Sequence, residues 1–304
     1  MRDSLQITES ADLLPILMSS NTIRIGPAGW SYKDWEGIVY PPHGSRFDHL
    51  AYLAGLFDTI EVNSSFYRIP PPTHGTSWNR RVAFNDDFRF TVKLYRGFTH
   101  DENSSREDVE AFRRFLDPLH DSGRLGSLLI QFPWSFKRSE NSMERIAGVL
   151  EHFHDYPKVV EVRHASFQNP EFHRFLDERN TGLVAIDQPL FSDSVKPSVT
   201  STGPLAYVRF HGRNYEKWFA HKESWERYDY LYSERELAPW SARIEAMATE
   251  RDVFVIMNNH FRGQAIINAV DMERSLGLPV RIPPPMVALM EERWARSAEQ
   301  GKGR

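Results

Sequence analysis

Six short apolar segments of the chain each end in a polar or charged side chain. In most of them polar and apolar residues alternate, as they do in a β-strand whose two faces meet different surroundings. Alternation puts three pairs of polar residues on a common face: Glu61 with Asn63, Glu161 with Arg163, and Arg209 with His211. Acids and bases brought together in this way can bind an anion and move protons. The segments are residues 59–63, 90–93, 128–131, 159–163, 183–187 and 207–211.

Five residues of these segments are candidates for catalysis. A carboxylate beside a basic group can act as a general base, and a lysine or a histidine can pass the proton on. In another interpretation the acids and bases only neutralise one another inside the protein. Because burying several ions is unfavourable and apolar replacements are often as stable, we interpret the cluster as functional. The candidates are Glu61, Lys93, Glu161, Asp187 and His211, the last with the alternative of orienting a carboxylate through a hydrogen bond.

A second set of residues is expected to hold the substrate. The chain after the last two strand candidates is rich in basic, amide and glycine residues, which favours an anion site there. Aromatic residues after the first two strands can form a wall of the same site, unless they only pack between loops. The set is Trp30, Tyr32, Asn63, Tyr67, Gln131, Arg163, Arg209, Gly212, Arg213, Asn258, Asn259 and Gly263.

Two histidines and one aromatic segment have two interpretations each. By alternation His164 lies on the opposite face from Arg163, which favours a structural role, whereas His260 either lines the site or caps the next helix. Residues 212–233 contain Tyr, Trp and Phe side chains interleaved with charges. We expect most of these rings to form a small satellite core, with one or two facing the site.

The candidate residues can meet only if their strands surround one centre. Two further strand candidates, residues 23–26 and 253–257, raise the number to eight, and helix-like segments separate most of them. This alternation predicts an α/β fold, a TIM-type (β/α)8 barrel of parallel strands whose active site lies in the loops after the strands. A doubly wound open sheet is the competing architecture, but residues 26–30 lack its phosphate-binding glycine pattern.

Helices are expected at six places, two of them with candidate N-caps at Ser105 and Asn169. The link between the sixth and seventh strands, residues 191–204, is short and polar, so we expect an irregular sixth crossover, followed by a long aromatic loop after strand 7. The expected helices are residues 47–57, 106–120, 143–154, 170–178, 234–249 and 263–275.

The composition is that of an ordinary globular protein. The 304 residues are 40% hydrophobic and 26% charged with a net charge of −4, which argues against a generally basic nucleic-acid or membrane surface but allows a local basic cleft. The absence of cysteine excludes disulfides and thiolate chemistry and makes the cytoplasm the default compartment. We expect a leader at residues 1–21, one barrel domain at residues 22–297 and a frayed tail at residues 298–304.

Seven segments, taken in order, resemble the YecE-like family, also called the domain of unknown function 72 family. They are residues 25–35, 61–67, 90–93, 131–133, 161–164, 207–213 and 258–260. The resemblance implies a TIM-type barrel, in agreement with the strand count, and it implies no reaction because the family has none assigned. Ala165 and Phe167 stand where the family pattern tends to have Pro and Trp, and these departures concern only the fifth loop.

The pattern favours an enzyme that binds a small anionic substrate, phosphorylated or sugar- or nucleotide-like, and moves protons with a carboxylate and Lys93 or His211. The reaction class stays open among hydrolase, isomerase and lyase. One alternative is a phosphoesterase or nuclease that uses a divalent metal, although the inward basic residues would compete for its ligands. The ligands of that metal would be Glu61, Glu161, Asp187 and His211.

Two further functions are weaker candidates. A glycosidase would place carboxylates after the fourth and seventh strands, where this chain has Gln131 and His211. A non-catalytic module would hold a metabolite or a nucleic-acid end without reaction. We expect no resident cofactor and no membrane partner, and the sequence does not predict the oligomeric state.

Overall fold

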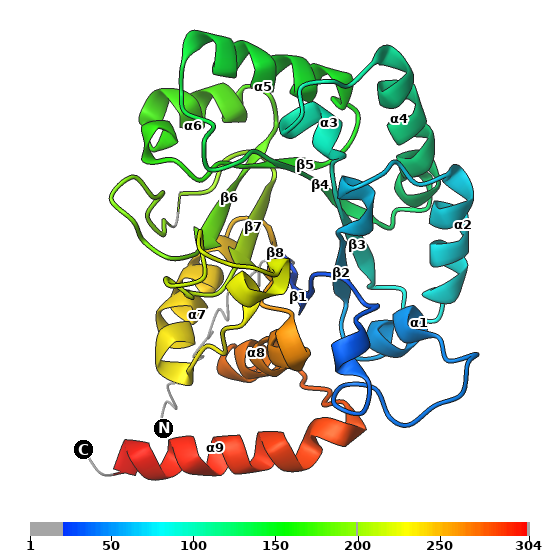
Figure 1. The fold of residues 1–304 in the computed structure, drawn as a ribbon, viewed down its shortest axis with the longest axis vertical. Helices are drawn as coiled ribbons and strands as arrows, with labels where there is room; N and C mark the ends of the chain where they lie inside the picture. The colour runs from blue at the N-terminus through cyan, green and yellow to red at the C-terminus, as the bar shows by residue number, and fades with distance from the viewer. Residues whose placement is uncertain (1–20, 199, 303–304) are drawn as a thin grey trace, which may run out of the picture.

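The computed structural model describes residues 21–198 and 200–302. In this part of the chain eight parallel strands alternate with helices around a common axis (Figure 1). Every predicted strand is present. The strands are β1 Ile23–Pro27, β2 Thr59–Val62, β3 Arg89–Lys93, β4 Leu125–Gln131, β5 Lys158–Glu161, β6 Gly182–Asp187, β7 Leu205–Phe210 and β8 Asp252–Met257.

The order of the strands identifies the sheet as a nearly closed barrel. Neighbouring strands pair in parallel in the order β1-β8-β7-β6-β5-β4-β3-β2, so that β1 and β2 meet at the remaining seam. A bridge between Ala28 and Glu61 joins them there, and the Gly29 amide donates to the Glu61 carbonyl at 2.8 Å. A doubly wound sheet would instead carry its first strand in the middle. The prediction of a TIM-type barrel is therefore confirmed.

The helices lie outside the strands (Figure 1). The predicted helices are present, and the Ser105 and Asn169 side chains accept hydrogen bonds at the starts of α4 and α6 as N-caps. No described helix is both long and apolar enough to cross a bilayer. The helices are α1 His49–Ala54, α2 Pro72–Arg81, α3 Arg96–Thr99, α4 Arg106–Asp121, α5 Glu140–His152, α6 Pro170–Asp177, α7 Glu234–Ala248, α8 Gln264–Ser275 and α9 Val287–Lys302. Short 3-10 helices are η1 Lys33–Trp35, η2 Ser64–Phe66, η3 Ala165–Phe167, η4 Ser224–Tyr228, η5 Phe261–Gly263 and η6 Pro284–Met286.

Three helices, α2, α3 and α9, were not among those expected. The α9 helix crosses the outside of α8 (Figure 1), where Asp271 accepts hydrogen bonds from Arg293 at 2.9 Å and Trp294 at 3.0 Å. It includes residues 298–302, which the sequence had placed in a frayed tail. Residues 1–20 of the expected leader and residues 303–304 of the tail lie outside the described residues.

The sixth crossover is irregular, as predicted. The described residues between β6 and β7, 188–198 and 200–204, contain no helix. This stretch is held instead by backbone hydrogen bonds to the loop after β5, from Ala165 to the Asp193 carbonyl and from Val195 to the Arg163 carbonyl.

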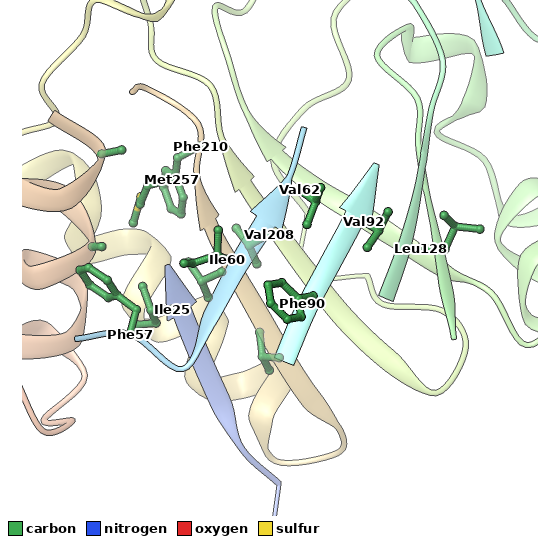
Figure 2. Packing of buried hydrophobic residues seen from close by; sticks show 14 of the residues in the cluster. Ile25, Phe57, Ile60, Val62, Phe90, Val92, Leu128, Val208, Phe210 and Met257 are labelled. Carbon is green, nitrogen blue, oxygen red and sulfur yellow. The ribbon is translucent and has the colours of Figure 1, made fainter. Parts of the chain in front are cut away.

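The apolar core has two layers because both faces of a parallel barrel are buried. Figure 2 shows side chains of the outer layer, among them Ile60, Val62, Phe90 and Val92, which belong to the cluster between strands and helices. The inner layer is smaller. It is formed by Ala28, Leu129, Val159, Val184, Ile186, Leu205, Tyr207, Phe254 and Ile256.

The close approach of β1 to β2 depends on Gly26. A Cβ atom at this position would lie 1.9 Å from the Thr59 carbonyl oxygen, which belongs to the backbone of β2 and cannot turn away. We predict that Gly26→Ala lowers the free energy of unfolding by about 1–3 kcal/mol or more in urea denaturation, since overpacking a buried contact has this effect. The matched control is Gly148→Ala in α5, where the added carbon meets no atom within 4 Å apart from its chain neighbours and the nearby backbone of its own helix. Equal stability of the two variants would contradict the proposed contact.

Candidate functional site

A cavity opens at the carboxyl ends of the strands, the end at which TIM-type barrels carry their active sites. Its volume is about 470 Å³. The loops after β1, β2, β7 and β8 supply its walls, and the ends of β3, β5 and β7 supply its basic side chains. It is lined by Gly29, Trp30, Ser31, Tyr32, Asn63, Ser64, Phe66, Tyr67, Lys93, Arg163, Arg209, Tyr228, Asn258 and His260.

The floor of the cavity is a buried ion network centred on Arg209. One guanidinium nitrogen donates to Glu61 at 2.6 Å and another donates to Glu161 at 2.5 Å. The Arg209 side chain is 1% exposed and both carboxylates are fully buried. Burial alone would lower the pKa of Arg209, but the two carboxylates outweigh it and raise that pKa above its ordinary value. The Arg209 guanidinium therefore stays charged.

The second carboxylate of the floor, Glu161, joins two more groups. Its Oε1 accepts from Arg163 at 2.9 Å and lies 3.1 Å from Nε2 of His211. Burial favours the neutral acid, yet Arg209, His211 and Arg163 together hold the pKa of Glu161 well below its usual range. This carboxylate is an anion that is already fully engaged by protein donors.

His211 is a neutral member of this network. Burial lowers the pKa of His211 to about 3, although Glu161 opposes the shift. Nδ1 lies 3.0 Å from the Asn258 amide nitrogen, so it accepts there, and the proton on Nε2 is donated to Glu161. The orienting hydrogen bond considered for His211 is thus present.

Tyr207 completes the environment of Glu61 and was not among the predicted site residues. Its hydroxyl lies 2.8 Å from Glu61 Oε2 and 2.8 Å from Thr91 Oγ1, and all three side chains are buried. Tyr207 lies two residues before Arg209 on β7, so alternation alone places both on the inner face. The same rule that selected Arg209 could have found it.

Lys93 differs from Arg163, Arg209 and Glu161 because its amine forms no hydrogen bond or ion pair with any described residue. Nζ lies 4.1 Å from the centroid of the Phe66 ring, a cation–π distance. Burial, with a further contribution from Arg209, lowers the pKa of Lys93 to about 7. The amine therefore titrates near neutral pH while it faces the cavity.

Aromatic rings form one wall of the cavity. Tyr32 stacks on His260 with 4.4 Å between centroids, and its hydroxyl donates to the Ala28 carbonyl at 2.6 Å. Gly29 has a φ of +88°, and a Cβ there would lie 2.7 Å from the Tyr32 hydroxyl, so only glycine fits beside this ring. Burial lowers the pKa of His260 to about 4. Of its two predicted roles, His260 lines the site.

The aromatic segment after β7 is divided between core and surface. Trp218 is buried, and the Arg163 guanidinium carbon lies 5.7 Å from the centroid of its ring. Tyr228 is the ring of this segment that lines the cavity. Several rings expected in a satellite core are exposed instead. These are Tyr215, Phe219 and Trp225.

His164 has the structural role expected from its face. Its Nδ1 accepts from the Ser166 amide at 3.1 Å, so the side chain caps η3, and it does not line the cavity.

The predicted placement of Asp187 at the mouth is corrected by its contacts. Its carboxylate accepts from Arg213 at 2.6 and 2.8 Å, from the Tyr232 hydroxyl at 2.7 Å and from Trp240 Nε1 at 2.8 Å. Trp240 belongs to α7, outside the barrel. The inner face of β6 is formed by Val184 and Ile186, so Asp187 points outward by the same alternation.

Other predicted ligands also lie away from the cavity lining. Asn259 donates to the Tyr230 carbonyl and to Asn268, both at 2.8 Å, and Gln131 donates to the neighbouring Phe132 carbonyl at 2.7 Å. Of the residues expected to form an anion site at and after the ends of β7 and β8, only Arg209 and Asn258 line the cavity. The predicted residues outside the lining are Gln131, Asp187, Gly212, Arg213, Asn259 and Gly263, while Glu61, Glu161 and His211 lie directly beneath it.

The four ligands considered for a catalytic metal do not gather in one place. Arg209 occupies the position between Glu61 and Glu161, and Asp187 faces the outer helices. Within residues 21–198 and 200–302, the group of three acid or histidine side chains with metal-like spacing is a different one, in the loop after β1.

Removing Arg209 should destabilise the fold strongly. Loss of one partner leaves buried carboxylates without compensation, which typically costs about 3–5 kcal/mol. We predict that Arg209→Met lowers the free energy of unfolding, measured by urea denaturation, by about this amount. The control Arg296→Met removes an exposed ion pair of α9 and should cost less than about 1 kcal/mol. Adding Glu61→Gln and Glu161→Gln to Arg209→Met should recover part of the free energy of unfolding. No recovery would mean that the loss comes from the packing of the Arg209 side chain and not from the unpaired carboxylates.

Comparisons with known proteins agree with this architecture. Residues 24–289 match the family described as "Protein of unknown function DUF72". UPF0759 protein YunF of Bacillus subtilis (strain 168) is 28% identical over 267 residues, covering 82% of this chain and 93% of that protein.

Two solved structures are similar over most of the chain. A DUF72 family protein from Thermotoga maritima is 34% identical with a TM-score of 0.74, covering 84% of this chain and 100% of that one. Another, from Enterococcus faecalis, is 29% identical with a TM-score of 0.75, covering 87% and 98%. The family match spans the barrel and includes every residue of the cavity lining, so the chain belongs to the DUF72 family.

Proposed function

We propose that this protein is an enzyme that binds a small anionic substrate in the barrel mouth and transfers a proton with Lys93. The observation that carries the proposal is the charge of the lining. Its ionisable acid–base residues include Lys93, Arg163 and Arg209 but, among the described residues, no carboxylate. Since Glu61 and Glu161 are buried beneath Arg209, a ligand in the cavity meets the positive side of the network.

The same basic residues also act on His100, which follows α3. Burial and then the nearby Lys93 and Arg163 lower the pKa of His100 to about 4. A negatively charged ligand would relieve the same repulsion, because an opposite charge within a few ångströms favours a cation. Phosphate and carboxylate groups both have the required charge.

The size and walls of the cavity suit a compact organic molecule. A volume of about 470 Å³ lies in the range of small-ligand sites, and a few convergent polar groups among aromatic rings are their usual lining. Trp30 and Tyr67 offer ring surface for a sugar or a base, and the amides of Asn63 and Asn258 offer hydrogen bonds. A phosphorylated sugar or a nucleotide combines these features.

Lys93 is the group best placed for proton transfer. A base works best when its pKa lies near the working pH, and Lys93 meets this condition with a pKa of about 7. Its amine has no competing carboxylate partner among the described residues, whereas Glu61, Glu161 and His211 are engaged with protein groups. Arg163 and Arg209 would stabilise negative charge that develops on the substrate after deprotonation. This chemistry is shared by isomerases, lyases and hydrolases.

The titration of Lys93 can be measured directly. Lysines of the purified protein are reductively methylated with a ¹³C label, and the Lys93 signal is assigned by its absence in Lys93→Met. We predict a midpoint near pH 7, against about 10.4 for exposed lysines. Saturating inorganic phosphate should raise the midpoint, since a bound anion favours the protonated amine. A midpoint above 10 without phosphate would remove Lys93 as the base.

Substrate binding and catalysis can then be separated. A thermal-shift screen of phosphorylated sugars, nucleotides and carboxylates should find stabilising ligands, because a ligand that binds the native state raises the thermal unfolding temperature. With a ligand that turns over, Lys93→Met should lower kcat by about 10²–10⁴-fold, the usual contribution of a general base. The exposed Lys137→Met serves as the control. Retained binding with no turnover of any ligand by the native protein would favour the non-catalytic module instead.

A further inference from the structure

We propose that Glu36, His43 and His49 form a binding site for a divalent transition-metal ion of the zinc type, outside the barrel mouth. One ligand atom from each of the three residues lies within 4.8 Å of the others. All three belong to the segment between η1 and the start of α1. Two imidazole nitrogens and a carboxylate oxygen are the ligand set that zinc and its neighbours in the transition series prefer.

Both imidazoles now contact the Glu36 carboxylate directly. His43 Nε2 lies 2.6 Å from Glu36 Oε2, and His49 Nε2 lies 3.1 Å from Glu36 Oε1. Zinc–ligand bonds of about 2.0–2.2 Å place neighbouring ligand atoms of a tetrahedron about 3.4 Å apart. The carboxylate must therefore move away from both rings to admit an ion, since each ring now contacts a different oxygen of Glu36. A fourth position would remain for water.

The contacts of His43 fix the orientation of its ring. Its Nδ1 lies 3.0 Å from the Gly44 carbonyl oxygen and its Nε2 faces Glu36, so both nitrogens meet acceptors. A histidine that donates its second ring nitrogen to a carbonyl is the usual arrangement behind a metal ligand, because it fixes the ring and its tautomer.

Aromatic packing holds the two imidazoles in place. His43 stacks on Phe47 with 4.2 Å between centroids and an angle of 12°, and Tyr40 meets His49 edge-on at 4.5 Å. The His43, His49 and Glu36 side chains are 18%, 25% and 44% exposed. The rings are thus ordered by packing, while the carboxylate stays open to an ion from solvent.

Metal binding is tested by titration of the full-length protein, without a histidine tag and after treatment with a chelator. We expect one equivalent of Zn²⁺ in calorimetry, and Co²⁺ should give the visible absorption of a tetrahedral or five-coordinate centre. His43→Ala and His49→Gln should each weaken binding at least about 10-fold, because loss of a supporting hydrogen bond alone weakens metal sites 10–100-fold. Unfolding midpoints without metal establish that each variant is folded.

The matched control is His154→Ala. His154 also has a carbonyl at Nδ1, that of Glu151 at 2.8 Å, and a carboxylate at Nε2, that of Asp155 at 2.9 Å, but no third acid or histidine of the described residues completes a metal-like cluster there. It should bind Zn²⁺ as the native protein does. Absence of a one-equivalent site in the native protein, or a site unchanged by both His43→Ala and His49→Gln, would overturn the proposal.

Discussion

The contact of Arg209 with two buried carboxylates determines how the polar interior of the barrel is arranged. Glu61 and Glu161 stand on β2 and β5, which are separated by two strands, and Arg209 reaches both from β7. Further hydrogen bonds to the two carboxylates help to offset the burial of these ions, although Arg209 Nε is buried without a hydrogen-bond partner among the described residues. Tyr207 supplies a further hydrogen bond to Glu61, while Arg163 and His211 do so for Glu161.

Because of this arrangement, the ionisable side chains at the mouth carry a net positive charge when Lys93 is protonated. Two guanidinium groups balance two carboxylates, so the charge of a protonated Lys93 has no counterpart in the network. Low-dielectric walls would strengthen the field of such a charge and so favour the anionic ligand that we propose. The fold alone would not identify this property, since TIM-type barrels carry many unrelated reactions. It follows from which side of the ion network faces the cavity.

The alternation of side chains along a strand predicted correctly which strand residues face the barrel interior. It did not predict the direction of side chains at and beyond the strand ends. Period 2 correctly placed Glu61, Glu161 and Arg209 inside the barrel, and the eight strands predicted its topology. Asp187 lies at the carboxyl end of its strand, as expected, but it shares the outer face of β6 because Val184 and Ile186 occupy the inner one. Gly212 and Asn259 lie beyond the strands, where loop geometry rather than a period decides direction. Helix α2 lacks a clear signal because Gly75 and several polar residues interrupt its apolar pattern.

The first loop connects the two sites in space. Tyr40, which packs on His49, donates its hydroxyl proton to the Trp30 carbonyl, and Trp35 Nε1 donates to the His260 carbonyl at 2.7 Å. Trp30 and His260 both line the cavity. An ion that crosslinks the loop at Glu36, His43 and His49 would therefore restrict the segment that carries one cavity wall. Such a restriction lowers the ordering entropy that a ligand must overcome, so metal occupancy and ligand affinity in the mouth would be coupled without direct contact.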